Sequence, residues 1–171
     1  MNTKKRRPNT IRLNGYNYAQ SGFYFVTICC QNKNPFFGRI EQGLMILNDA
    51  GEMIEQLWNE LTNKYPILRL HSYVVMPDHF HGIIQICKDD VISLASIMDA
   101  FKSETTVRYI SGVKQKGWPP FDKHLWQRNY YEHIIRDQRG FDNITAYIIE
   151  NPQKWGINNE EGAHKGCPYE I

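Results

Sequence analysis

Two histidines one residue apart are the first feature of this chain that could do chemistry. His79 and His81 lie in the run from Ser72 to Gln85, which otherwise has the residue types of a buried β-strand. Side chains alternate between the two faces of a strand, so both imidazoles point to one face and Phe80 points to the other. Neutral imidazole is the commonest protein ligand for metal ions, and two of them side by side supply half of a divalent metal site.

The plainer interpretation is a pair of satisfied, partly buried histidines. It is costly in an apolar strand, because the pair then needs hydrogen-bond partners for up to four ring nitrogens. The same alternation places Ile83 on the histidine face and Ile84 and Ile86 with Phe80 on a core-facing side. Metal or phosphate chemistry is therefore the favoured hypothesis, with the structural interpretation kept as its alternative.

A second group of polar residues lies in the last predicted helix, which runs from residue 138 to about residue 155. Ile144, Tyr147, Ile148 and Asn151 fall at i, i+3, i+4 and i+7, so they share one helix face. The isoleucines should turn that face, with its phenol and amide oxygen, to a sheet. A buried Asn needs a polar partner, and a metal ion is one candidate. Tyr147 alone could equally be a packed tyrosine with its hydroxyl at the rim.

The hydrophobic pattern predicts the elements that must position these groups, in the order strand, helix, strand, strand, helix, strand, helix. Pro77 and Asp78 divide the histidine region into two antiparallel strands, or bend one strand. We predict an α+β, ferredoxin-like (RRM-like) fold, an antiparallel sheet with helices packed on one face. The predicted strands are 23–30, 68–76, 79–87 and 125–135, with a short strand or hairpin in 39–47, and the predicted helices are 48–64, one capped by Ser93, and 138–155.

Length and composition indicate one soluble globular domain. The chain has 171 residues, of which 42% are hydrophobic and 22% charged. No apolar run is long enough to span a bilayer, so we expect no membrane association and a cytoplasmic location. The cysteines show no C-x-x-C spacing and are expected to be reduced thiols: Cys29, Cys30, Cys87 and Cys167.

The net charge of +2 neither demands nor excludes a nucleic-acid partner. Its distribution is more informative, because residues 1–20 form a basic arm and residues 157–171 a polar tail. Such an arm is equally a solvated tail or a phosphate-binding element. Its cations are Lys4, Lys5, Arg6 and Arg7.

The order and spacing of these motifs resemble the single-tyrosine HUH transposases, and most of all the REP-associated tyrosine transposases. The resemblance covers nearly the whole chain, as a single transposase domain over residues 1–171. Besides the basic arm, the segments that carry it are Val26-Thr27-Ile28, Val74-Val75-Met76-Pro77-Asp78-His79-Phe80-His81, Phe101-Lys102-Ser103, Trp126-Gln127-Arg128, Tyr130-Tyr131-Glu132-His133, Tyr147-Ile148 and Asn151-Pro152.

This resemblance implies metal-dependent nicking and joining of single-stranded DNA with hairpin ends. The Tyr147 hydroxyl would attack a phosphodiester, leaving a covalent 5′-phosphotyrosine and a free 3′-hydroxyl, and a second 3′-hydroxyl would reverse the attack. His79, His81 and Asn151 would hold Mg²⁺ or Mn²⁺, which makes the phosphate electrophilic toward a phenol of pKa ~10. The resemblance leaves open a homodimer with sites shared between chains, or a monomer.

Further residues are expected at the DNA. Lys102, Arg128 and the arm from Lys4 to Arg7 are expected phosphate contacts. Tyr130 and Tyr131 compete with Tyr147 for the role of nucleophile, and we interpret them as strand residues that pack or stack on bases. The other histidines of this half of the chain are expected to be structural or to contact phosphate: His124 and His133.

Two alternative functions use the same features. A nucleic-acid-binding module without catalysis would bind DNA whether or not a metal or Tyr147 is present. A metal-dependent phosphoesterase would use the histidine pair with water as the nucleophile and form no protein–DNA adduct. A third possibility is a host-domesticated relative of the transposases, which keeps their chemistry but no longer moves its own gene.

Overall fold

This computed structural model describes residues 20–89 and 92–160, so the basic arm and the end of the polar tail lie outside the described residues. The strands are β1 (Gly22–Cys29), β2 (Gly38–Glu41), β3 (Leu44–Leu47), β4 (Leu68–Val75), β5 (His79–Ile86) and β6 (Tyr131–Ile135). The helices are α1 (Asp49–Lys64), α2 (Leu94–Lys116) and α3 (Gln138–Glu160), with a 3-10 turn at Gln31–Lys33.

Four of the strands form one antiparallel sheet in the order β4-β5-β1-β6, and β2 and β3 form a separate hairpin. β4 and β5 are two antiparallel strands joined at Pro77 and Asp78, where the Met76 N–H donates to the His79 carbonyl at 2.8 Å. β5 therefore lies inside the sheet, between β4 and β1, and the histidine pair has a strand on either side.

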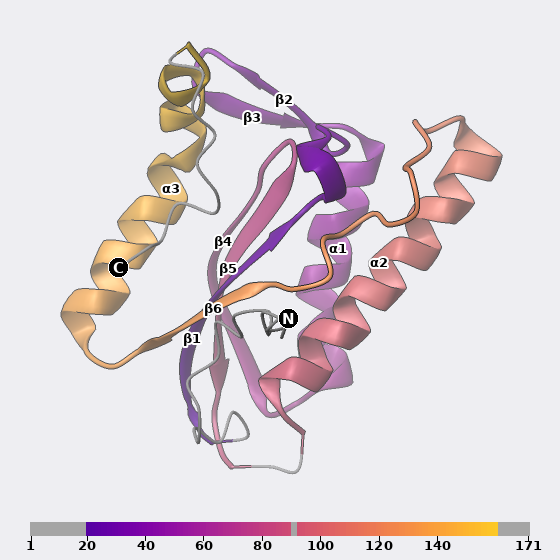
Figure 1. Cartoon of the computed structure of the whole chain (residues 1–171). Helices are drawn as coiled ribbons and strands as arrows, with labels where there is room; N and C mark the ends of the chain where they lie inside the picture. The colour runs from indigo at the N-terminus through magenta and orange to yellow at the C-terminus, as the bar shows by residue number, and fades with distance from the viewer. Residues whose placement is uncertain (1–19, 90–91, 161–171) are drawn as a thin grey trace, which may run out of the picture.

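Helices cover both faces of this sheet (Figure 1). The α+β class with a four-stranded antiparallel sheet is confirmed. The expectation that the helices share one face holds for α1 and α2, whereas α3 packs on the opposite face. The reason is that the strands carry apolar side chains on both faces of the sheet, in alternation. The set that meets α1 and α2 includes Tyr24, Val26, Ile28, Phe80 and Ile84, and the set that meets α3 includes Phe25, Ile83 and Ile135.

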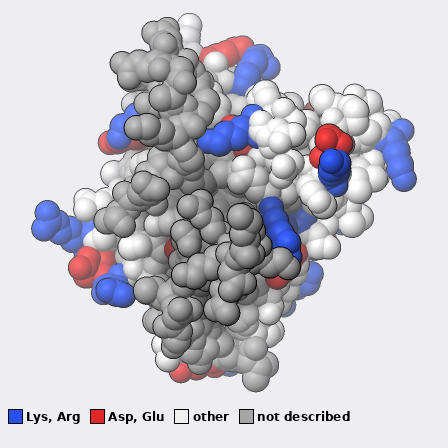
Figure 2. All heavy atoms as spheres, viewed as in Figure 1, with Lys and Arg blue, Asp and Glu red and all other residues white. Residues whose placement is uncertain are grey.

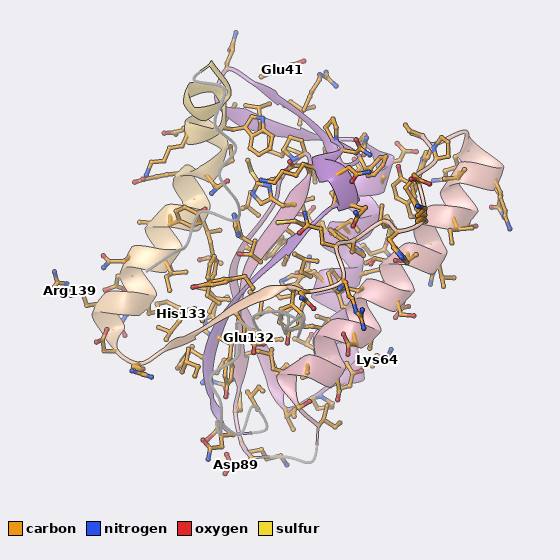
Figure 3. All side chains as sticks on the ribbon, in the orientation of Figure 1. Glu41, Lys64, Asp89, Glu132, His133 and Arg139 are labelled. Carbon is orange, nitrogen blue, oxygen red and sulfur yellow. The ribbon has the colours of Figure 1, made fainter. Side chains whose placement is uncertain are left out.

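Side chains fill the space between the sheet and the helices on either side, while Glu41 and Arg139 point outward (Figure 3). On the face seen in Figure 2, the described Lys and Arg side chains are scattered and interspersed with Asp and Glu. Among the described residues, no helix is long and apolar enough to cross a membrane.

Local chemistry explains where the helices begin and end. The Asn48 side chain accepts from the Gly51 N–H at 2.9 Å to start α1, and Ser93 accepts from the Ser96 N–H at 3.2 Å to start α2. α2 continues to Lys116 and is capped by Gly117 with φ 71°, a left-handed conformation that favours glycine. The last strand is shorter than predicted.

Candidate active site

β5 presents both histidines on the face covered by α3. His81 is fully buried, and the side chain of His79 is 12% exposed. Their ring centroids are 4.6 Å apart, and Phe80 points the other way into the core against α1 and α2. The alternation expected from the sequence is therefore present in the strand.

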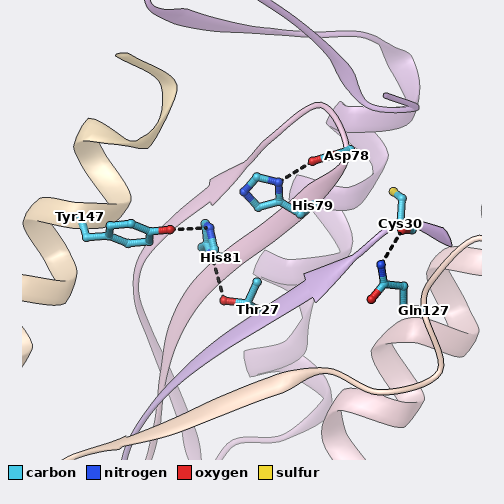
Figure 4. Close-up of polar contacts among 7 residues, drawn as sticks. All are labelled: Thr27, Cys30, Asp78, His79, His81, Gln127 and Tyr147. Carbon is cyan, nitrogen blue, oxygen red and sulfur yellow. Dashed lines mark hydrogen bonds and ion pairs between the residues drawn. The ribbon is translucent and has the colours of Figure 1, made fainter. Parts of the chain in front are cut away.

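A hydrogen bond holds one ring nitrogen of each histidine (Figure 4). His81 Nδ1 lies 2.7 Å from Thr27 Oγ1, and His79 Nδ1 donates to Asp78 Oδ1 at 2.5 Å. Thr27 is placed there by β1, because its backbone pairs with His81 in the sheet. Such second partners set ring orientation and leave the Nε2 atoms of both rings for other contacts.

Tyr147 reaches this pair from α3. Its hydroxyl oxygen lies 3.4 Å from His81 Nε2, on the side of the ring opposite Thr27 (Figure 4). The tautomer that carries its proton on Nδ1 satisfies both contacts, with the Tyr147 O–H donating to Nε2 and the Nδ1–H donating to Thr27. One chain thus supplies both the histidine pair and the tyrosine.

Asn151 lies one helical turn beyond Tyr147 and is buried, with 8% of its surface exposed. Ile144 and Ile148 on the same side of α3 pack in the apolar cluster with Phe25 of β1. The face of α3 that the sequence predicted to meet the sheet is therefore the one that does so.

The electrostatics keep His81 neutral near neutral pH. Burial, with the neighbouring His79 as a smaller cause, lowers the pKa of His81 well below its ordinary value. A neutral imidazole can offer a nitrogen lone pair to a metal ion, whereas an imidazolium cannot.

The donor atoms fit a divalent cation. His79 Nε2 is buried and has no hydrogen-bond partner among the described residues, so a cation bound there would offset its desolvation. Those residues contain no group of three His, Cys, Asp or Glu that could hold a metal. A site here would need an amide oxygen in addition to the two imidazoles, and Asn151, buried one helical turn beyond Tyr147, is the candidate for it.

Two ring contacts at the site were not predicted. The Phe25 ring stacks on His81 with centroids 5.4 Å apart, and the Trp155 indole lies over His79 with centroids also 5.4 Å apart. Trp155 continues the i, i+4, i+8 series that starts at Tyr147, so its helical spacing was the available signal. For Thr27 no such signal exists, because strand register is set by contacts distant in sequence.

The remaining predicted residues lie on several other parts of the chain. The Lys102 ammonium donates to two backbone carbonyls of the segment that precedes β6, and Arg128 in that segment is exposed. Tyr131 packs in the apolar cluster under α3, and Tyr130 packs against the core on the other face. His124 is exposed and His133 is half-buried on β6, and the cations of the arm from Lys4 to Arg7 lie outside the described residues.

Comparison with known proteins places the chain among transposases. A family model described as Transposase IS200 like matches residues 24–151. The chain is similar to an uncharacterized protein of Haemophilus influenzae, with 40% identity over 161 residues, 85% of this chain and 88% of that protein. It is more distantly similar to a REP-associated tyrosine transposase of Escherichia coli, with 24% identity, 81% of this chain and 71% of that protein.

A solved structure of a REP-associated tyrosine transposase bound to a REP hairpin shares the fold. Its TM-score is 0.58 at 23% identity, and the match covers 82% of this chain and 72% of that one. A histidine pair on a central strand, facing a tyrosine on a helix that covers the sheet, is the arrangement expected of a tyrosine transposase. The chain belongs to the IS200-like transposase family, and the resemblance to REP-associated relatives is confirmed.

Proposed function

We propose that this protein nicks and joins single-stranded DNA through a covalent intermediate on Tyr147. The observation that supports it best is the 3.4 Å approach of the Tyr147 hydroxyl to His81 Nε2 within one chain. A nucleophile must lie beside the group that binds and polarises the scissile phosphate, and these two residues come from segments 66 positions apart.

In the first step the Tyr147 oxygen forms a bond to phosphorus and the bond from phosphorus to the 3′-oxygen breaks. The tyrosine proton is lost, and the departing 3′-oxygen takes up a proton to become a 3′-hydroxyl. A second 3′-hydroxyl then attacks the phosphotyrosine, which restores Tyr147 and joins a new strand. The bond energy is held in the phosphotyrosine, so the joining step needs no nucleotide cofactor.

His79, His81 and Asn151 would hold a divalent cation, Mg²⁺ or Mn²⁺. When bound, the cation would act as a Lewis acid on the non-bridging oxygens of the scissile phosphate. Asp78 and Thr27 keep the two rings oriented for this role. His81 Nε2 cannot accept the Tyr147 proton and ligate a cation at once, so Tyr147 would have to give up this hydrogen bond before a cation could be held there.

The proposed substrate is single-stranded DNA flanked by a hairpin, because the relative of known structure is bound to a REP hairpin. Arg128, Lys102 and the basic arm from Lys4 to Arg7 are proposed to act at its phosphates. Since one chain supplies both halves of the site, a monomer suffices for the chemistry, and a homodimer would have to add something other than the tyrosine.

The test is a denaturing gel of the protein with labelled single-stranded hairpin DNA from the flanks of its own gene, with and without Mn²⁺. We expect a metal-dependent covalent adduct in the unaltered protein and none in Tyr147→Phe, which should still bind DNA. Tyr131→Phe is the matched control and should keep the adduct. Cleavage without an adduct would instead indicate a hydrolase, and DNA binding with neither would indicate a binding module.

A further inference from the structure

An irregular segment lies beside β1 at the end of the sheet that carries His79. β1 pairs with β6 as far as Thr27 and Tyr131, and the next contact is an isolated bridge between Cys30 and Trp126. Between these two pairings β1 has two residues, whereas the opposite chain has four, 127–130. The surplus residues must bulge away from the sheet.

The backbone of this bulge is held from two sides. On the sheet side, the Gln127 N–H donates to the Cys29 carbonyl at 2.8 Å, and Gln127 Nε2 donates to the Cys30 carbonyl at 3.3 Å (Figure 4). On the helix side, the residue just before the bulge is fixed, because Trp126 Nε1 donates to Thr105 Oγ1 of α2 at 2.9 Å.

Lys102 also holds the bulge from the side of α2. Its ammonium donates to the carbonyls of Gln127 and Arg128, each at 2.9 Å, so two successive carbonyls of the bulge are fixed to α2. Burial lowers the pKa of Lys102, as expected for an ammonium turned inward to backbone oxygens. The side chains of Arg128 and Asn129 are exposed.

The bulge lies near the histidine pair. Cys29, which accepts a hydrogen bond from the bulge, pairs directly with His79 across β1 and β5. Adjacent strands are about 4.8 Å apart, so the backbone of the bulge lies on the order of 10 Å from that of His79. A strand whose scissile phosphate sits at the histidines would have a neighbouring phosphate within reach of an arginine side chain here.

We infer that Lys102 is a positioning residue that clamps the 127–130 bulge so that Arg128 binds a phosphate of the single-stranded DNA next to the scissile one. This inference rests on the proposed function and changes the role of Lys102 from a phosphate contact to a support for one. Two of its three N–H donors are used by carbonyls, so a direct contact through the third is the competing explanation.

Salt dependence of DNA binding separates the two. Each phosphate contact to single-stranded DNA contributes about 0.7 to the slope of log K against log salt. With the labelled hairpin oligonucleotide as probe, we expect Arg128→Met and Lys102→Met each to reduce this slope by about 0.7. The double variant should reduce it by the same amount, because without its support Arg128 has already lost its contact.

A combined reduction of about 1.4 in the double variant would mean that Lys102 itself binds a phosphate, and would overturn the inference. An unchanged slope in Lys102→Met would also overturn it, because Lys102 would then neither contact a phosphate nor support the phosphate contact of Arg128. Lys114→Met, which removes an exposed charge near the end of the same helix, is the control for charge loss alone.

Hydrogen exchange tests the clamp without DNA. In Lys102→Met we expect faster exchange of the Gln127 amide, with exchange in β5 unchanged, and in Lys114→Met no change at either place. Unchanged exchange at Gln127 would overturn the clamp. If the unaltered protein bound no DNA, the proposed function and the phosphate contact of Arg128 would both be contradicted. The exchange data would still decide whether Lys102 holds the bulge.

Discussion

Thr27 is a side chain outside the proposed metal ligands that holds one ring of the histidine pair. Its hydroxyl shares a 2.7 Å hydrogen bond with His81 Nδ1 in a buried position. The contact fixes the orientation of the ring, and with the proton on Nδ1 the Nε2 lone pair faces Tyr147 of α3. Removing such a partner leaves the ligand in place but lets its ring rotate and change tautomer.

We predict that Thr27→Val, which keeps the side-chain shape, weakens Mn²⁺ binding by about 10- to 100-fold. Isothermal titration with Mn²⁺ measures this directly. Thr62→Val is the control, because the Thr62 hydroxyl donates to the Asn59 carbonyl on the surface of α1. Equal Mn²⁺ affinities in Thr27→Val and the unaltered protein would show that His81 needs no such support.

His81 also predicts how stability depends on pH. Its pKa is lowered in the folded protein, while in the unfolded chain it is near ~6.5. Below ~6.5 the unfolded state therefore binds the extra proton, and the free energy of unfolding falls as pH falls toward the folded-state pKa. One such group contributes at most about 1.4 kcal/mol per pH unit.

Urea unfolding between pH 7.5 and 5 measures this dependence on the metal-free protein. We expect His81→Asn to have a shallower decline in stability than the unaltered protein over the same range. His124→Asn, at an exposed histidine, is the control and should leave the decline unchanged. Parallel curves for all three proteins would contradict a buried neutral His81.

At the scale of elements, β5 contributes side chains to both faces of the sheet. One side of it meets Trp58 and Phe101 through Phe80, and the other carries the histidines. Gly82 lies within this strand, next to the Trp58 ring. A Cβ at Gly82 would lie 2.7 Å from Trp58 Cζ2 and 2.9 Å from Phe80 Cε1.

We predict that Gly82→Ala lowers the free energy of unfolding by about 1–3 kcal/mol, because two buried rings must move to admit the methyl group. Urea denaturation gives the value. Ser103→Ala on the exposed side of α2 is the control and should change stability by no more than about 0.5 kcal/mol. An unchanged free energy of unfolding in Gly82→Ala would mean that α1 can move away from the sheet to admit the methyl group.

At the scale of the whole molecule, the proposed metal ligands come from two layers. His79 and His81 belong to the sheet, and Asn151 belongs to α3. The far end of α3 also meets the β2–β3 hairpin, where a Cβ at Gly43 would lie 3.4 Å from the Gln153 side chain. A cation bound by all three ligands would tie α3 to the sheet in the folded state alone.

Mn²⁺ should therefore stabilise the protein by linkage, by about 2.7 kcal/mol at a concentration of 100 Kd. A thermal-melt series with Mn²⁺ and with EDTA tests this. We expect the shift to be lost in His79→Ala and reduced in Asn151→Ala, and to be kept in Asn143→Ala, at an exposed asparagine of the same helix. An equal shift in Asn151→Ala and the unaltered protein would remove Asn151 from the ligand set.

Much of the site could be predicted from the sequence because it follows local geometry. The alternation of β5 places His79 and His81 on one face, and the helical period places Tyr147 and Asn151 on one face of α3. These patterns depend on residues a few positions apart, as do the helix caps at Asn48 and Ser93. The roles of these side chains in DNA chemistry stay predictions.

Other features were decided by tertiary structure. The pairing of Thr27 with His81, the position of α3 on the histidine face and the clamp of Lys102 on the bulge join residues 25 or more positions apart. Such contacts depend on which strands become neighbours and which apolar face each helix covers, and only the packing of the whole core settles that. The sequence by itself thus determined which side chains share a face, and the tertiary structure decided which faces meet.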